Sequence, residues 1–226
     1  DAAERPAPAP KLDTTELVDS VEEALRYVRS LDGSSLDRVL RRALARHGLP
    51  AFVDDLVPHL MHRIGDQWTA NEITIAHEHL ASAAVLAVLF DTMRGLPDAP
   101  SSRRLLVATP AGEHHAVGAA LAATAAALDG WTVVYLGADV PSADIVSAAA
   151  ATQARAVLLS AVHTDNPDQM LKDLRTVRTE VPASIPVVIG GAAARKVGRR
   201  LSDAGLIVCD SFAEMRDALS RHGLAA

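Results

Sequence analysis

Residues 105–118 read LLVATPAGEHHAVG, and their pattern indicates the fold class. It opens with a short apolar run that is typical of a strand, and it closes where an alanine-rich helical segment begins. A strand that passes through a short loop into a helix is the first half of a βαβ unit. In an open parallel sheet, such a loop lies at the carboxyl edge, where ligands bind. His115 stands in this loop, two residues after Glu113.

The C-terminal part of the chain repeats this strand-and-helix rhythm. Helical segments separate the short apolar runs, which predicts a parallel sheet covered on both faces. We therefore expect an α/β domain over residues 102–226, with five parallel strands in a doubly wound, flavodoxin-like sheet. The predicted strands are Leu105–Ala108, Trp131–Leu136, Ala156–Val162, Pro186–Ile189 and Leu206–Cys209.

The N-terminal part has helical rather than strand periodicity. Between residues 14 and 96, apolar side chains recur at three- and four-residue spacing, which predicts a four-helix bundle. Pro58 is expected to kink the third helix. Thr69 and Glu72 match the capping-box pattern, so they are expected to open a long fourth helix that runs to Arg94.

Composition excludes several classes of protein. Of the 226 residues, 49% are hydrophobic and the formal net charge is −6, which does not favour binding of nucleic acid by bulk charge. Cys209 is the single cysteine, so no internal disulfide can form. It lies in an apolar run and is expected to be a buried structural thiol. A reducing compartment fits this usage, and we expect a cytoplasmic protein.

Neither a membrane span nor a signal peptide is expected. The longest uncharged stretches, such as residues 80–90 and 116–128, are shorter than the roughly 20 residues that cross a bilayer. Residues 1–13 are rich in proline and alanine, which predicts a linker to a preceding domain or a disordered tail.

Three features of the predicted sheet fall on loops at one edge. A neutral imidazole at His115 can bind a transition metal, with Glu113 to orient the ring. Ser160 places a small hydroxyl at the end of the third strand, and Gly190-Gly191 leaves room for a ligand after the fourth. Gly118 lets a ligand approach the backbone of the next helix. Taken singly, an exposed histidine and a plain strand-to-helix turn are the commoner interpretations.

In this combination the segment resembles cobalamin-binding domains of the methionine-synthase type, whose signature is Asp-x-His-x-x-Gly, Ser-x-Leu and Gly-Gly. The resemblance covers residues 103–226 and departs from the signature at Glu113, where aspartate is usual. It implies that His115 is the lower cobalt ligand and that the nucleotide tail of the cofactor enters the slot lined by the serine and glycines. The matching motifs are Glu113-x-His115-x-x-Gly118, Ser160-x-Val162 and Gly190-Gly191.

The helical half extends the resemblance. Trp68 is followed ten residues later by Glu78-His79, which resembles the helical cap of the CarH and LitR group of light-responsive MerR-type repressors. The similarity then covers residues 14–226. It implies that Trp68 and Ile75 enclose the adenosyl group of adenosylcobalamin, that Glu78 hydrogen-bonds it, and that His79 lies at the same site.

From the residues alone, these positions have plainer interpretations. Trp68 is expected to be a core aromatic, and Glu78 could face water. His77 and His79 are two positions apart and point to different sides of a helix, so they make a poor chelate. In light-sensing members of the group, a histidine that captures cobalt after photolysis follows the tryptophan. Thr69 occupies that position here, which leaves His77 and His79 as weak substitutes.

Three functions remain open at this point. The first is a non-enzymatic sensor that binds adenosylcobalamin, with light cleaving the cobalt–carbon bond and changing bundle packing and homo-oligomerisation. It would contact DNA only through an N-terminal domain absent from this chain. The second is a corrinoid methyl carrier of a methyltransferase system, and the third is a flavodoxin-like binding protein without cobalt.

Overall fold

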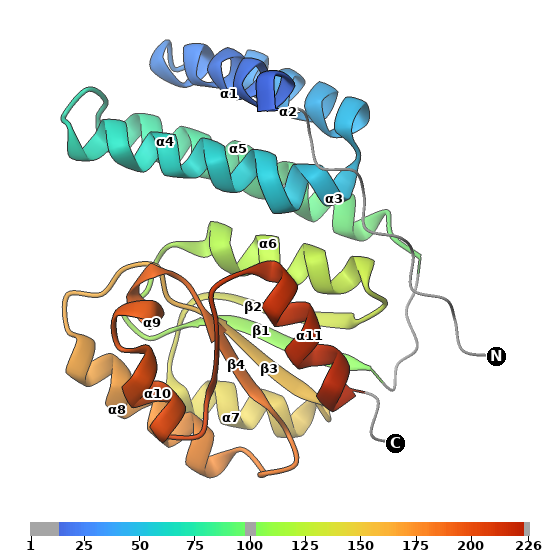
Figure 1. Ribbon diagram of the computed structural model, residues 1–226, viewed down its shortest axis with the longest axis vertical. Helices are drawn as coiled ribbons and strands as arrows, with labels where there is room; N and C mark the ends of the chain where they lie inside the picture. The colour runs from blue at the N-terminus through green and yellow to red at the C-terminus, as the bar shows by residue number, and fades with distance from the viewer. Residues whose placement is uncertain (1–13, 98–102, 224–226) are drawn as a thin grey trace. The chain divides into compact units, whose positions relative to one another are not determined.

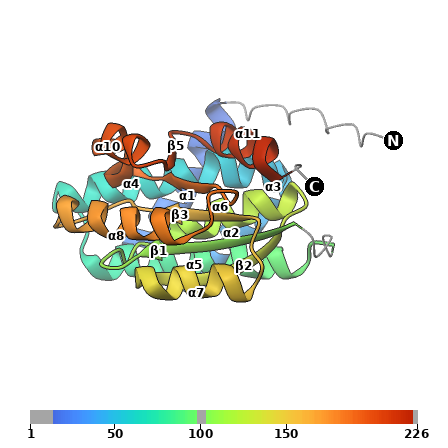
Figure 2. The ribbon, with the colours of Figure 1, turned by 90° about the horizontal axis from the view of Figure 1, so that it is seen from below.

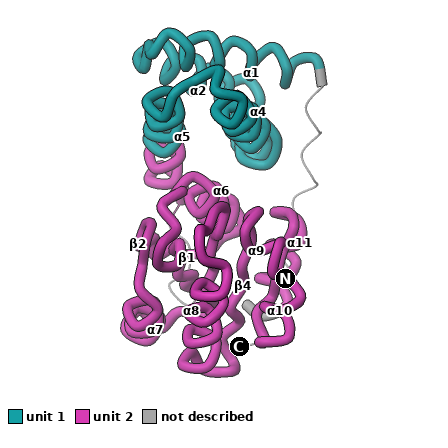
Figure 3. The backbone as a smooth tube through the Cα atoms, turned by 90° about the vertical axis from the view of Figure 1, so that its left-hand side faces the viewer, with its two compact units in different colours: residues 1–88 teal, residues 89–226 magenta. Residues whose placement is uncertain are grey.

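The protein comprises two compact units in a computed structural model that describes residues 14–97 and 103–223. The units are residues 1–88 and 89–226 (Figure 3), so the division falls within a helix, α5 (Ile75–Arg94). The predicted N-terminal linker, residues 1–13, lies outside the described residues. Each unit is described separately below.

The first unit is helical, as predicted. Its buried face repeats the predicted spacing: in the first helix Val21, Leu25 and Val28 are fully buried. The third, fourth and fifth elements form one continuous helical stretch between residues 49 and 69. The described part of the unit therefore has four helical stretches, as the sequence predicts. The elements are α1 (Thr14–Arg29), α2 (Gly33–His47), α3 (Leu49–Ala51), the π-helical turn η1 (Phe52–Leu56), α4 (Val57–Thr69) and α5.

Around Pro58 the helix changes its hydrogen-bonding register. The N–H of Val57 bonds to the carbonyl of Phe52, five residues earlier, which defines the π turn. Proline offers no N–H to the carbonyl four residues before it, and a wider turn directly before the proline accommodates that loss. The predicted disturbance at Pro58 therefore takes the form of a π turn, and the helix continues through it.

The predicted capping box of Thr69 and Glu72 is wrong. Thr69 is the last residue of α4, where its hydroxyl donates to the carbonyl of Gly65 at 2.8 Å. The reciprocal cap lies five residues later, because the backbone N–H of Thr74 donates to Nδ1 of His77 at 3.1 Å. A histidine thus takes the role that Glu or Gln has in the usual motif.

The second unit contains the predicted five-stranded parallel sheet. Its strand order is β2-β1-β3-β4-β5, the flavodoxin-like arrangement. The third strand ends at Ser160 and not at the predicted Val162, whose N–H leaves the sheet to donate to the side chain of Glu113. The strands are β1 (Arg104–Pro110), β2 (Thr132–Val140), β3 (Ala156–Ser160), β4 (Val187–Gly190) and β5 (Ile207–Cys209).

Helices cover both faces of this sheet (Figure 1). On one face lie α6 (Ala116–Leu128) and α11 (Phe212–Gly223). On the other, α7 (Ser142–Ala151) packs beside α8 (Pro167–Glu180), as Figure 2 also shows. Two short helices, α9 (Ala192–Lys196) and α10 (Gly198–Asp203), follow β4.

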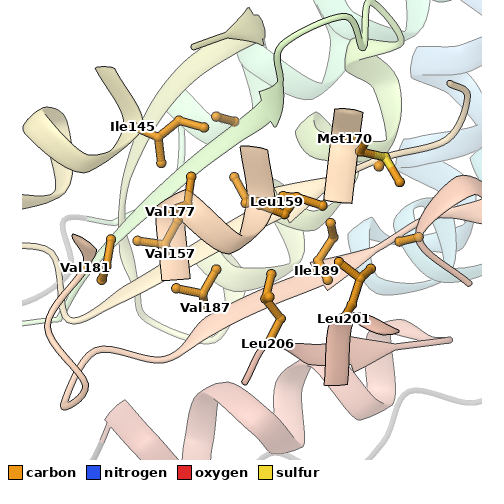
Figure 4. Packing of buried hydrophobic residues seen from close by; sticks show 14 of the residues in the cluster. Ile145, Val157, Leu159, Met170, Val177, Val181, Val187, Ile189, Leu201 and Leu206 are labelled. Atoms are coloured by element: carbon orange, nitrogen blue, oxygen red, sulfur yellow. The ribbon is translucent and has the colours of Figure 1, made fainter. Parts of the chain in front are cut away.

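Buried aliphatic side chains join the sheet to α8 and α10. Leu159 and Ile189 of neighbouring strands lie beside Met170 and Leu201 in one cluster (Figure 4). Each of these side chains is at most 4% exposed. Apolar burial of this extent makes the sheet a stable base for the loops at its edge. Among the described residues, no helix has the length and apolar character that a bilayer crossing requires.

Candidate functional site

The strand order places a topological switch point beside β1. The chain leaves β1 towards one edge of the sheet through β2, whereas β3 continues towards the other edge. In doubly wound sheets, ligands bind in the crevice at the carboxyl ends of the two strands where the order reverses. The loop that carries Glu113 and His115 follows β1, and Val162 and His163 follow β3. The predicted residues therefore stand at both sides of this point.

Glu113 and His115 form a close pair in the first of these loops. Nδ1 of His115 lies 2.6 Å from Oε1 of Glu113, and the backbone N–H of His115 donates to the same oxygen at 2.8 Å. The glutamate is 2% exposed, whereas the histidine side chain is 50% exposed. His115 also takes the N-cap position of α6. The buried carboxylate thus orients a ring that reaches the surface.

This geometry selects one tautomer of the imidazole. A carboxylate accepts hydrogen bonds, so the proton of a neutral ring resides on Nδ1, and the lone pair resides on Nε2. Histidines that bind metals show this arrangement, in which the second ring nitrogen donates to a carboxylate. His115 is therefore prepared for metal ligation through Nε2.

The carboxylate of Glu113 remains ionised in spite of its burial. Burial alone would raise its pKa, but the hydrogen bonds from the His115 ring and from the backbone of His163 and His115 outweigh it and lower the pKa below the usual value. An ionised Glu113 is a better acceptor for the ring N–H of His115.

The other oxygen of Glu113 reaches the end of β3. Oε2 accepts the backbone N–H of Val162 at 2.5 Å and that of His163 at 2.6 Å. A single side chain thereby joins the two loops that flank the switch point. The ring of His163 also lies near that of His115, with a centroid separation of 5.9 Å.

Gly118 allows α6 to pass close to the end of β3. A Cβ at this position would lie 2.7 Å from Oγ of Ser160 and 3.4 Å from Val162. The sequence predicts that Gly118 makes room for a ligand, and the structure shows that it also makes room for the serine. Ser160 is buried, with 6% of its surface exposed.

Gly190 and Gly191 have different steric roles. At Gly191 the φ angle is +106°, and an added Cβ would lie 2.2 Å from the carbonyl oxygen of Ala161, so only glycine fits. At Gly190 a Cβ would meet the carbonyl oxygen of Cys209 at 3.3 Å. Ser160 and Gly190 are paired in neighbouring strands. The serine and the glycine pair thus lie together at the predicted slot.

Cys209 has the predicted structural role. Its side chain is buried, and burial raises the pKa of the thiol to about 11. A thiol with such a pKa is protonated at neutral pH and is a poor nucleophile and metal ligand.

The donor set suits a metal that brings most of its own ligands. In the described ranges of the chain, no group of three or more His, Cys, Asp or Glu side chains could hold a metal ion. A cobalt ion held by a corrin takes most of its ligands from the ring, so few side-chain donors are required from the protein. The single oriented ring of His115 would supply such a donor.

The four predicted residues of the helical unit lie where α4 ends and α5 begins. Trp68 is 52% exposed and Ile75 is 58% exposed, so the expectation of a core tryptophan is wrong. Glu78 contacts its own helix, with Oε2 2.7 Å from Nδ1 of His79 and Oε1 2.6 Å from the hydroxyl of Ser82. Trp68 and Ile75 therefore expose apolar surface at the end of the unit that also carries Glu78. This end of the unit could contact a ligand.

Sequence reasoning missed Thr109 and Asp139. Both hydrogen-bond to the loop that carries Glu113 and His115. A threonine at the end of a buried strand is a weak signal of such a role, and so is an aspartate after a glycine in a strand. The contacts of Asp139 are remote in sequence, because it lies 30 residues after Thr109 and 27 residues after Gly112.

Comparison with known proteins decides the family. A family model described as the B12 binding domain matches residues 103–221, more than half of the chain. The chain belongs to the B12 binding domain family. A second family model with the same description matches residues 20–90, which lie in the helical unit. The predicted resemblance is therefore confirmed for both halves.

Two curated proteins of Myxococcus xanthus are similar in sequence. The HTH-type transcriptional repressor CarA is 30% identical over 83% of this chain, and the HTH-type transcriptional repressor CarH is 32% identical over 77%. The matches span 63% of CarA and 58% of CarH, so this chain corresponds to only part of each repressor.

The fold is also that of a solved corrinoid protein. The monomethylamine corrinoid protein of Methanosarcina barkeri superposes with a TM-score of 0.66 at 19% identity, over 92% of this chain and 100% of that protein. At this identity the likeness concerns the fold.

Proposed function

We propose that this chain is the adenosylcobalamin-binding, light-sensing module of a transcriptional regulator and is not an enzyme. One observation carries the proposal: the half-exposed His115 ring is held through Nδ1 by the buried carboxylate of Glu113. This arrangement makes Nε2 the ring nitrogen that would bind a metal. The membership of the B12 binding domain family and the similarity to two transcriptional repressors support it.

The sheet unit would hold the lower face of the cofactor. His115 would ligate the cobalt, and the nucleotide tail would enter the slot at the ends of β3 and β4. Ser160 offers a hydroxyl there, and Gly190 and Gly191 allow close approach of the neighbouring backbone at Cys209 and Ala161. Val162, which is 39% exposed, would supply an apolar contact beside the ring.

The helical unit would contact the upper ligand. Trp68 and Ile75 expose enough apolar surface to enclose an adenosyl group, and Glu78 can accept a hydrogen bond from it. His79 lies at the same end of α5 and contacts Glu78. An indole stacked on an adenine base would gain about 1–3 kcal/mol, which is sufficient to distinguish adenosyl from methyl ligands.

Removal of the upper ligand would provide the signal. Adenosylcobalamin supplies a cobalt–carbon bond that visible light cleaves. Trp68 and Ile75 would then lose the group that covers them, and the helical unit would repack or associate with a second copy to bury them again. The homo-oligomeric state would thus depend on light. Contact with DNA would come from a region outside this chain, as the names of the two repressors suggest.

Reconstitution tests this proposal directly. The chain is loaded with adenosylcobalamin in the dark, and its absorption spectrum and its mass by size exclusion are measured before and after illumination. We expect a spectrum without benzimidazole coordination and with histidine bound to cobalt, and a change in mass after light. An unchanged spectrum and mass would remove the light-sensing function. A colourless protein after loading would remove cobalamin binding as well.

A corrinoid methyl carrier is the second candidate. The observation that favours it is the shared fold with the monomethylamine corrinoid protein. A carrier should prefer methylcobalamin, whereas a sensor with Trp68 at the upper ligand should prefer adenosylcobalamin. The ratio of the two dissociation constants therefore distinguishes the candidates.

A further inference from the structure

Behind the loop of Glu113 and His115 lies a second polar network. Thr109 is fully buried near the end of β1. Its hydroxyl donates to the backbone carbonyl of Glu113 at 2.5 Å and accepts the backbone N–H of Asp139 at 2.9 Å. A buried hydroxyl that both donates and accepts is fully engaged, so Thr109 joins β2 to the loop.

Asp139 completes this network from β2. Its Oδ1 accepts the backbone N–H of Gly112 at 2.8 Å, and its own N–H lies 3.0 Å from the carbonyl oxygen of Glu113. Its φ angle is +58°, in the left-handed region where aspartate, asparagine and glycine are best tolerated. The side chain itself is half-exposed. Asp139 therefore holds the loop through both its backbone and its carboxylate.

The loop needs such support because its own turn is short. The N–H of Glu113 bonds to the carbonyl of Pro110 at 3.0 Å, and Gly112 has a φ of +80°. Glycine at the third position of a turn is conformationally permissive. Glutamate also has one more rotatable bond than aspartate, so it loses more side-chain entropy when its carboxylate is fixed. An anchored backbone reduces the range of positions that this carboxylate can reach.

We propose that Thr109 and Asp139 are positioning residues for the lower metal ligand. They fix the backbone of Glu113, so that one carboxylate oxygen meets Nδ1 of His115 while the other meets the amides after β3. Both residues would act through the loop backbone, to which they hydrogen-bond. This inference rests on the proposed function, since it assumes that His115 is the ligand.

Two pairs of variants test the proposal. Thr109→Val removes the hydroxyl and keeps the shape of the side chain, and Thr109→Ser keeps the hydroxyl. Asp139→Gly removes the acceptor and keeps the tolerance of a positive φ, and Asp139→Asn keeps both. The measurements are the dissociation constant for hydroxocobalamin, the spectral signature of histidine bound to cobalt, and the ¹⁵N signals of the His115 ring in the cofactor-free protein.

We expect Thr109→Val and Asp139→Gly to raise the dissociation constant about tenfold, the lower end of the range for residues behind a metal ligand. Their His115 rings should show a smaller fraction of the Nδ1–H tautomer. Thr109→Ser and Asp139→Asn should stay within about twofold of wild type. The melting temperatures of the cofactor-free variants, compared with that of wild type, show whether a variant is folded. Because the side chain of Asp139 is half-exposed, its variants provide a test even if Thr109→Val fails to fold.

Wild-type affinity and tautomer in both Thr109→Val and Asp139→Gly would overturn the positioning role. Equal weakening in all four variants would also overturn it, because the conservative replacements retain the proposed contacts. Failure of the proposed function gives a different result: wild type would bind no hydroxocobalamin, or His115→Ala would retain the wild-type spectrum.

Discussion

The two units of this protein hold their candidate residues in contrasting ways. In the sheet unit, Glu113 accepts hydrogen bonds from the His115 ring and from backbone amides of two loops. In the helical unit, Trp68 and Ile75 are more than half exposed, and the carboxylate of Glu78 hydrogen-bonds to His79 and Ser82 of its own helix. The first set is organised before any ligand arrives, whereas the second has apolar surface that a ligand could cover.

This difference suits the two roles proposed for the units, which are to hold the metal and to respond to loss of the upper ligand. A lower ligand that must hold the metal throughout benefits from a rigid support, because preorganisation reduces the entropy lost on binding. The side chains around the upper ligand must respond when the adenosyl group is lost. They do so more readily if their covered and uncovered states have similar free energies. We expect substitutions in the sheet unit to affect stability and binding strongly, and those in the helical unit to affect ligand preference.

The largest effect should come from Gly191→Ala. The new Cβ would approach the carbonyl oxygen of Ala161 at 2.2 Å, at a φ of +106°. Strain and overpacking together should lower the free energy of unfolding by about 3 kcal/mol or more, as measured by denaturant titration. Gly112→Ala is the control, because its φ is also positive but its Cβ would meet no atom within 4 Å. Equal losses in the two variants would show that the contact at Ala161 is not rigid.

His115→Ala should weaken cobalamin binding next most strongly. Loss of the axial imidazole should raise the dissociation constant about 100-fold, the upper end of the range for residues around a metal site, and should remove the histidine-bound spectrum. His62→Ala is the matched control, since its side chain is 77% exposed and its partner, Asp66, lies on the same helix of the helical unit. Base-off binding that is as tight in His115→Ala as in wild type would contradict the assignment of the ligand.

Trp68→Ala should change ligand preference with little change in stability. The affinity for adenosylcobalamin relative to methylcobalamin should fall about tenfold, because a stacked aromatic side chain is lost. The free energy of unfolding should change by less than about 0.5 kcal/mol, since the side chain is exposed. Val18→Ala, at another exposed apolar position of the helical unit, should leave the preference unchanged. A preserved preference in Trp68→Ala would favour the methyl-carrier function.

The smallest effect concerns the pH dependence of the cofactor-free protein. The pKa of Glu113 is lowered in the fold, so its charge stabilises the protein above the ordinary value of 4.5, and this contribution is lost as the pH falls through the folded-state pKa. The difference in unfolding free energy between wild type and Glu113→Gln should be about 1 kcal/mol at neutral pH and should shrink in acid. Glu72→Gln, at an exposed glutamate of the helical unit, is the control. A difference that stays constant down to pH 3 would contradict an ionised Glu113.

The sequence alone predicts correctly those features that depend on residues close together in the chain. The five strands and the pairing of Glu113 with His115 depend on neighbours in the chain, and both predictions are confirmed. The cap of α5 was misplaced by five residues, because Thr69 and Thr74 both precede suitable partners. Periodicity could not decide between them, since the choice depends on where the preceding helix ends.

Tertiary structure decided what depends on distant partners. The second oxygen of Glu113 meets amides 49 and 50 residues away, and Thr109 meets Asp139 30 residues away. No local pattern encodes such contacts, because they arise only when neighbouring strands of a parallel sheet bring their carboxyl ends together. The exposure of Trp68 is likewise a property of the assembled helices, since burial depends on the number of packed neighbours and not on the residue's own hydrophobicity.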